Sequence, residues 1–192
     1  MNSLIHVFRA SIVSTLLIAI MFCGAYPLAV YAIGRAFPAQ ADGSLIRIGD
    51  NVIGSALIGQ SFSGAAWFHP RPSAAGKGYD AAASSGTNLG PLSIKLIEAV
   101  RRRVDGYRKE NGLDDGVSVP ADAVTSSASG LDPHISVRNA RLQGPRVAAA
   151  RGLTPEAVQA KIDACTEGRQ LGFLGQPRVN VLLLNLALEG KR

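Results

Sequence analysis

Hydroxyl, carboxylate and imidazole side chains gather in one short segment of the chain, from Thr125 to Ser136. Ser129, Asp132 and His134 are the residue types of a hydrolytic triad, in which serine attacks, histidine takes its proton and aspartate orients the imidazole. Triad members usually converge from separated segments of a fold, and the sequence contains no GxSxG nucleophile turn. Hydrolysis is therefore an alternative interpretation of this segment and not the leading one.

The same segment has the chemistry to bind a phosphate group. The hydroxyls of the segment, those of Ser127 and Ser129 among them, could line a concave anion site together with the backbone amides of Ser129 and Gly130. A structural interpretation competes with both readings, because Asp132 and Pro133 would form a turn whose polar groups bond locally. From the residue pattern alone we favour the structural interpretation.

The sequence contains none of the ATP-hydrolysing motifs that active transport requires. A phosphate-cradling GxxxxGK[ST] loop is absent, and so is the Asp-Lys-Thr-Gly segment expected of a P-type pump. The histidines His6, His69 and His134 are too dispersed for a histidine-rich metal site, and Cys23 and Cys165 are not placed to form a disulfide. We therefore expect no catalytic residues and no metal site in this chain.

The basic composition does not indicate a nucleic-acid partner. The formal net charge is +6, but Lys and Arg are dispersed through Gly- and Ala-rich sequence and only 6% of the residues are aromatic. The densest basic run, residues 101–103, is interpreted as a solvated helix face, with an acidic partner surface as the alternative.

A long uncharged segment lies near the N-terminus. Residues 10–34 carry no charge, and about 25 residues at 1.5 Å each give roughly 37 Å of helix, enough to cross a bilayer core of about 30 Å. A cleaved signal peptide is the rival, since Ala39-Gln40-Ala41 resembles a cleavage site, but signal peptides usually have apolar regions of only about 7–15 residues. We predict a short tail at 1–9, a retained transmembrane helix at 10–34 and a soluble domain at 38–192.

Small side chains recur every fourth residue of the predicted transmembrane helix, at Ser11, Thr15 and Ala19. Such a face allows a second helix to approach closely, which makes these residues candidates for contact with a membrane partner. Pro27 removes one backbone donor inside the helix, so we expect a kink there. Basic residues flank both ends of the helix and do not decide its orientation.

Capping residues and apolar periodicity predict three helices in the soluble domain. The first runs between Ser93 and Gly112, and the third opens at Thr154-Pro155-Glu156 and continues to about residue 165. The second spans 136–152, and we expect Gly144-Pro145 to interrupt it.

Strand signals are shorter and weaker. Residues 44–48 alternate as a strand does, and 51–60 form an apolar stretch punctuated by glycine. Residues 67–91 lack periodicity and predict a long loop. The apolar run 179–188 is favoured as a buried strand. The fold class is therefore α+β, with one transmembrane helix followed by one mixed soluble domain.

Five blocks of sequence, in this order behind a single N-terminal span, resemble the C subunit of the Kdp potassium-transporting ATPase. Together they extend over nearly the whole chain. The blocks are Gly54–Gln60, Phe68–Ser73, Tyr79–Pro91, Ser129–Ser136 and Gly168–Leu188.

The resemblance implies a non-catalytic, single-pass subunit of the inner membrane with no firmly bound cofactor. Its expected partners are a channel-like potassium-binding subunit, a P-type ATP-hydrolysing subunit and a small fourth subunit. It would act as a catalytic chaperone that raises the ATP affinity of the hydrolysing subunit, with ATP bound only in their joint complex. The residues expected at the nucleotide are Ser127, Ser129, Gly130, Asp132 and His134.

A simpler expectation is that the soluble domain lies outside the cytoplasm and covers the outer mouth of the potassium subunit, which would stabilise the assembly. Expected partner contacts are Tyr79 and Asn88 in the long loop, together with the small residues of the span. The competing function is a membrane-anchored extracytoplasmic hydrolase that uses Ser129, Asp132 and His134.

Overall fold

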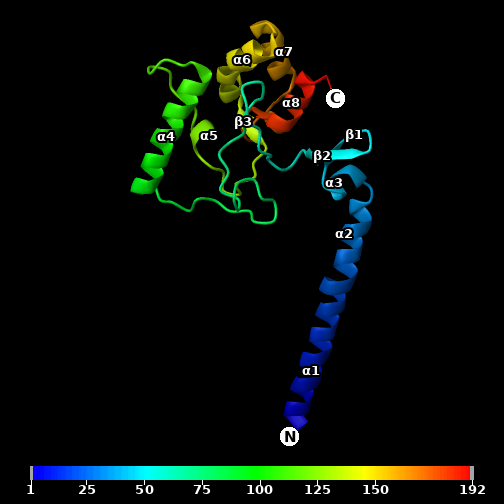
Figure 1. Ribbon diagram of the computed structural model, residues 1–192. Coiled ribbons are helices and arrows are strands. Elements are labelled where there is room, and N and C mark those ends of the chain that lie inside the picture. Colours follow the sequence, from blue (N-terminus) through cyan, green and yellow to red (C-terminus); the bar gives the residue numbers. More distant parts are fainter. Residues whose placement is uncertain (1, 191–192) are drawn as a thin grey trace. The chain divides into compact units, whose positions relative to one another are not determined.

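The computed structural model describes residues 2–190 of the chain (Figure 1). The chain divides into two compact units, one up to Leu45 and one from Ile46 onward. The first unit is dominated by a long helix, and the second is a mixed helix-and-sheet domain, so the α+β prediction is confirmed.

The first unit contains one continuous helical rod built from α1 (Asn2–Ala19), the π-helical segment η1 (Ile20–Ala25) and α2 (Tyr26–Gly34). Its large apolar side chains are exposed along the whole rod. Within the described residues, Ser3–Gly34 is the one helix that is long and apolar enough to cross a membrane. Residues 2–9, predicted to be a short tail, are part of the helix α1.

The π-helical segment has an identifiable cause in Pro27. A proline has no backbone N–H, and its ring crowds the carbonyl four residues earlier, here that of Cys23. The wider turn lets the backbone N–H of Tyr26 donate to the carbonyl of Met21, five residues earlier. The expected disturbance at Pro27 therefore takes the form of a π-bulge.

A short connection follows the rod. It contains α3 (Pro38–Ala41) and an ion pair of 3.0 Å between Arg35 and Asp42. The strands β1 (Leu45–Ile48) and β2 (Asn51–Ser55) then form a two-stranded sheet. Both predicted strands are present, although the second ends at Ser55 instead of residue 60.

The domain from Ile46 onward is built on a small antiparallel sheet in the order β3–β5–β4. Its strands are β3 (His134–Ser136), β4 (Thr166–Glu167) and β5 (Arg178–Asn180). The helices α6 (Val137–Arg151), α7 (Pro155–Ala164) and α8 (Val181–Leu188) pack together beside it (Figure 1). Inward side chains of these helices and of β3 and β5, together with Phe68 and Cys165, make one apolar core: Phe68, Ile135, Ala140, Val147, Ala148, Val158, Ile162, Cys165, Val179, Val181, Leu184 and Ala187.

The helix α6 corrects the predicted interruption at Gly144-Pro145, because it runs unbroken through both residues. Pro145 removes one internal hydrogen bond, at a cost of about 3 kcal/mol in a free helix. Packing offsets this cost, since Ile162 and Val158 of α7 pack against α6 at Gly144. The packing of α7 on α6 therefore outweighs the helix-breaking tendency of Gly144-Pro145.

The run 179–188 was predicted to be a strand, and this is wrong beyond Asn180. The strand β5 ends at Asn180, whose side chain accepts a hydrogen bond from the N–H of Leu183 and so caps α8. The helix is buried around most of its circumference. An all-apolar helix has no hydrophobic period, which is why the sequence did not distinguish it from a strand.

The other two predicted helices are confirmed. The helix α4 (Ile94–Asn111) ends at Gly112 in a left-handed conformation, and α7 begins at Pro155 with Thr154 as its cap. A short helix, α5 (Ala121–Val124), was not predicted. Residues 56–93 contain no helix or strand, in agreement with the predicted long loop.

Candidate functional site

A pocket of about 470 Å³ opens beside β3 and carries most of the charged groups of the candidate site. Asp132 and His134, predicted from the sequence, line it. Arg71 from the long loop, Asp122 from α5 and Arg178 from β5 complete its charged wall. Four separate segments of the chain therefore converge on one cavity.

The carboxylate of Asp132 organises one side of this pocket. Its Oδ2 lies 3.0 Å from Nη1 of Arg71, and its Oδ1 accepts from the backbone N–H of His134 at 3.0 Å and lies 3.4 Å from that imidazole. Burial by itself would raise the pKa of Asp132, but the hydrogen bonds from His134 and the charge of Arg71 together lower it to about 2. Asp132 is therefore an anion at neutral pH.

The carboxylate of Asp122 organises the other side. It accepts from the backbone N–H of Ser136 at 2.8 Å, from the Ser136 hydroxyl at 2.9 Å and from the amide of Asn139 at 2.9 Å. The hydroxyl of Ser136 in turn caps α6 by accepting from the N–H of Asn139. This confirms the predicted cap and ties α5 to the start of α6.

The basic side chains of the pocket each have a carboxylate nearby. Nε of Arg178 donates to Glu167 at 2.9 Å, and Nε2 of His134 lies 3.9 Å from the same carboxylate. One donor is left over, because Nε of Arg71 is buried without a hydrogen-bond partner in the described protein. The pocket could therefore receive a small polar or anionic group, but its charges are largely balanced internally.

Ser127, Ser129 and Gly130 lie in a tight junction between two loops. The hydroxyl of Ser129 accepts from the N–H of Leu131 at 3.1 Å and lies 3.4 Å from the hydroxyl of Ser127. The carbonyl of Ser129 accepts from the N–H of Ser85 at 3.0 Å. Local bonding of these groups supports the structural interpretation of the segment.

Gly130 shows how closely this junction is packed. Its φ is +70°, and a Cβ added there would lie 2.6 Å from the carbonyl oxygen of Ser85 and 2.7 Å from the nitrogen of Ala75. Only glycine fits such a contact between backbones. The residue is therefore explained by packing without any ligand.

The proposed triad is not assembled in the structure. Among the hydrogen bonds of residues 2–190, none joins Ser129 to His134. The partners of His134 are Asp132 and Glu167, and those of the Ser129 hydroxyl are Ser127 and Leu131. The geometry therefore brings Asp132 and His134 together but gives the hydrolase interpretation no nucleophile–base contact.

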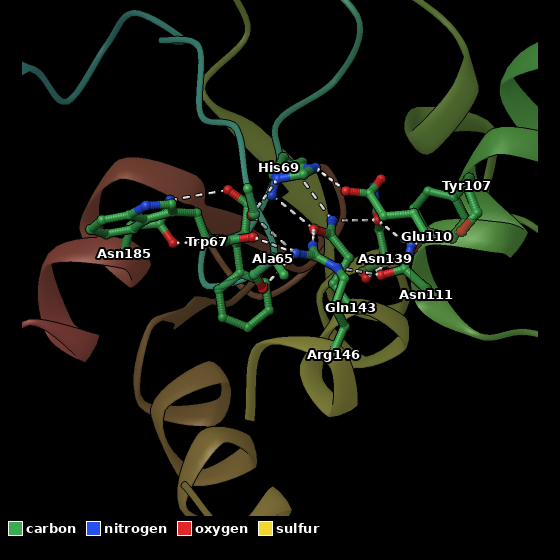
Figure 2. A network of polar contacts seen from close by, with 12 residues as sticks. Ala65, Trp67, His69, Tyr107, Glu110, Asn111, Asn139, Gln143, Arg146 and Asn185 are labelled. Atoms are coloured by element: carbon green, nitrogen blue, oxygen red, sulfur yellow. Dashed lines mark hydrogen bonds and ion pairs between the residues drawn. The ribbon is translucent and has the colours of Figure 1, made fainter. Parts of the chain in front are cut away.

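A second polar network, shown in Figure 2, fixes the start of the long loop. Nη1 of Arg146 donates to the carbonyls of Ala65 at 2.7 Å and Trp67 at 3.0 Å, and its Nη2 donates to Gln143 at 2.9 Å. Its Nε donates to Asn111 on α4 at 2.9 Å. One guanidinium of α6 therefore joins the loop to α4, and burial lowers its pKa.

Two amide side chains bond to the backbone of the same loop. Each one accepts from the N–H and donates to the carbonyl of a single loop residue, as a neighbouring strand would. Gln143 accepts from the N–H of His69 at 2.7 Å and donates to its carbonyl at 3.1 Å. Asn185 of α8 makes the same pair of bonds to Phe68, at 2.9 and 3.0 Å. The backbone of Phe68 and His69 is therefore held by bonds to α8 and α6 although this segment has no regular secondary structure.

The remaining members of the network connect α4 to α6 and to the long loop (Figure 2). The hydroxyl of Tyr107 donates to Asn139 at 2.8 Å, and burial raises the pKa of that tyrosine. His69 lies 3.0 Å from Glu110, also on α4. Sequence reasoning missed this network, because its members are polar residues scattered over more than a hundred positions.

The predicted partner contacts fall in different surroundings. Ser11 and Thr15 lie in a shallow, mostly apolar groove on the exposed helix, and Ala19 is exposed on the same helix. Tyr79 is half-buried: its hydroxyl donates to the carbonyl of Arg71 at 2.7 Å, and burial raises its pKa to about 12. Asn88 is exposed with a φ of +52°. Their role at an interface stays a prediction.

Comparison with known proteins gives a consistent family. Residues 8–190 match the family described as "K+-transporting ATPase, c chain". The chain is 59% identical over 165 residues to the potassium-transporting ATPase KdpC subunit of Mycobacterium tuberculosis strain H37Rv, covering 85% of this chain and 87% of that relative. It is 54% identical over 185 residues to the KdpC subunit of Caulobacter sp. strain K31, covering 95% and 93%.

Proposed function

This chain belongs to the family of c chains of the K+-transporting ATPase, and we propose that it is a non-catalytic accessory subunit of an ATP-driven potassium import complex. Its partners would be a potassium-binding channel-like subunit, a P-type ATP-hydrolysing subunit and a small fourth subunit. It would reside in the inner membrane as a single-pass protein with its domain in the periplasm. The expected contribution is to the assembly and activity of the complex.

The observation that carries this proposal is the helix Ser3–Gly34, whose large apolar side chains are uncovered along its length. Such a surface is stable in lipid or against other membrane helices, and not in water. A single span cannot enclose a pore by itself. Any transport role of the chain is therefore shared with partners that supply the pore.

The domain would act by covering the outer mouth of the potassium subunit. Residues 65–69 of its long loop are held by Arg146, Gln143 and Asn185, so this part of the loop needs little ordering on binding. The binding energy would then stabilise the assembled complex, and one transport state over another if the two differ in this contact.

A test of the assembly role is to co-express the complex with and without this chain. We expect that omission lowers co-purification of the potassium-binding and hydrolysing subunits, or abolishes their potassium-stimulated ATP hydrolysis. A complex that assembles and hydrolyses ATP normally without the chain would contradict an accessory function.

We also infer, from the family resemblance, a role as a catalytic chaperone that raises the ATP affinity of the hydrolysing subunit. The supporting features are the basic side chains of Arg71, His134 and Arg178 around one pocket and the unpaired Nε of Arg71. The nucleotide contacts would be Ser127, Ser129, Gly130, Asp132 and His134. On this hypothesis Ser129→Ala or His134→Ala raises the KM for ATP without dissociating the complex, and unchanged values in both variants would remove its support.

The side of the membrane on which the domain lies separates the two mechanisms. Asp115 is fully exposed, so Asp115→Cys in a Cys23→Ala chain offers an accessible thiol, while Cys165 is buried. Labelling by a membrane-impermeant reagent in cells with a permeable outer layer would support the covering mechanism. Labelling only after lysis would place the domain beside cytoplasmic ATP and favour the chaperone mechanism.

A further inference from the structure

Apolar and basic side chains lie together, uncovered, where α4 begins. Leu92 is 91% exposed and Ile94 is 71% exposed, and Ile97 follows on the next turn at 41%. Exposed lysine and arginine side chains flank them. We call these residues the α4 entry patch: Leu92, Ile94, Lys95, Ile97, Arg101 and Arg102.

The α4 entry patch carries positive charge that its surroundings in the sequence do not cancel. Glu98 is the only acidic residue between Asp80 and Asp105. Its carboxylate lies 3.9 Å from Arg102, and both side chains are more than half exposed, so this pair is weak. The first turn of α4 holds no acidic residue, and the free N–H groups at a helix start add partial positive charge. The patch is therefore suited to an anionic surface.

The size of the patch argues against a protein partner as its main occupant. A stable protein–protein interface buries about 800 Å² on each side and involves roughly 20–30 residues per partner. A patch of six residues on a convex helix end supplies only part of such an area. Apolar residues flanked by lysine and arginine on a helix are, in contrast, the pattern that binds at the boundary between lipid headgroups and acyl chains.

The chain also tethers this patch to a membrane. The helix Ser3–Gly34 is suited to cross the bilayer, and the domain is covalently joined to it. A tethered site binds at a high effective concentration, so even a weak lipid contact becomes populated. We propose that the α4 entry patch binds anionic lipid at the membrane surface, with Leu92, Ile94 and Ile97 at the acyl boundary and the three basic residues on the lipid phosphates.

The test uses the full chain, with Cys23→Ala, reconstituted in vesicles. A polarity-sensitive fluorophore is attached at Leu92→Cys, which lies outside the helix and is almost fully exposed. The matched control is Lys109→Cys, an exposed position in the last turn of α4 and roughly 20 Å along the same helix. The remaining thiol, Cys165, is buried, and a chain without an added cysteine measures its background labelling.

We expect the emission at position 92 to shift to shorter wavelength in vesicles containing phosphatidylglycerol, and not in pure phosphatidylcholine. The label at position 109 should not shift in either. Each of the variants Arg101→Gln and Arg102→Gln should lower the ratio of docked to free patch about fivefold, the effect of removing one basic group from an anionic surface.

Three results would overturn the proposal. The first is no shift at position 92 in anionic vesicles. The second is an equal shift in both lipids, which would show that charge plays no part. The third is a shift that appears only when the other subunits of the complex are present, which would assign the patch to an acidic protein surface.

Discussion

Nη1 of Arg71 lies 3.0 Å from Oδ2 of Asp132 and joins two loop segments that are 61 residues apart in the chain. The same guanidinium donates to the carbonyl of Ser126 at 3.4 Å. The segment whose residue types suggested catalysis is therefore a junction at which the long loop meets β3. The carboxylate of Asp132 and the imidazole of His134 therefore contribute to holding these segments of the fold together.

The first prediction concerns that junction. Asp132→Asn keeps the size of the side chain but removes the charge that Arg71 and His134 bind, and both partners would be left part-buried. We expect a loss of about 1–3 kcal/mol in the free energy of unfolding. Urea unfolding in detergent, followed by the fluorescence of Trp67, the single tryptophan, measures it. The exposed control Asp105→Asn should change stability by less than about 0.5 kcal/mol.

The pH dependence of stability follows from the same carboxylate. The pKa of Asp132 falls from 3.8 to about 2 in the folded protein. A lowered folded-state pKa means that its stabilisation is fully present above about pH 4 and is lost as the pH falls toward 2. The stability gap between the native chain and Asp132→Asn should therefore shrink over that window. A gap that stays constant from pH 6 to pH 2 would contradict the assignment.

The hydrogen bonds of Arg146 predict a larger loss of folding stability than the one expected for Asp132→Asn. In Arg146→Met the carbonyls of Ala65 and Trp67 lose their donor, and Asn111 loses its partner across to α4. We expect roughly 2–4 kcal/mol less stability. Arg141→Met on the same helix removes only an exposed pair with Asp163 and should cost no more than about 0.5 kcal/mol. Equal losses of stability in the two variants would show that the hydrogen bonds of Arg146 contribute no more than an exposed ion pair.

The small-residue face of the span predicts a specific packing defect. Thr15→Leu and Ala19→Leu fill the face that a partner helix would approach, and should lower the yield of partner subunits that co-purify with the chain. Leu17→Met, on the opposite side of the helix, is the control and should leave the yield unchanged. A yield that is insensitive to all three changes would remove this face from the interface.

The sequence predicted a helix correctly where a single residue determines where that helix begins or ends. Ser136 and Thr154 each accept a hydrogen bond at a helix start, and Gly112 takes the left-handed conformation that ends α4. Tertiary contact decided the other cases. The helix α6 continues through Pro145 because α7 packs on Gly144, and α8 has no period because it is buried on most sides.

The candidate site could be predicted only in part for a similar reason. Asp132 and His134 are neighbours in sequence, so their contact was accessible to pattern reasoning. Arg71, Asp122 and Arg178 reach the same pocket from distant segments, and no local motif marks them. A single sequence, read by itself, does not show which distant residues meet.

The most direct test of the accessory function removes the domain and keeps the helix. Residues 40–192 are deleted, the remaining span is co-expressed with the other subunits, and potassium-stimulated ATP hydrolysis of the purified complex is measured. We predict that stimulation is lost or strongly reduced, because the contact made by the domain is absent. Full potassium-dependent activity in the truncated complex would contradict the claim that the domain is required.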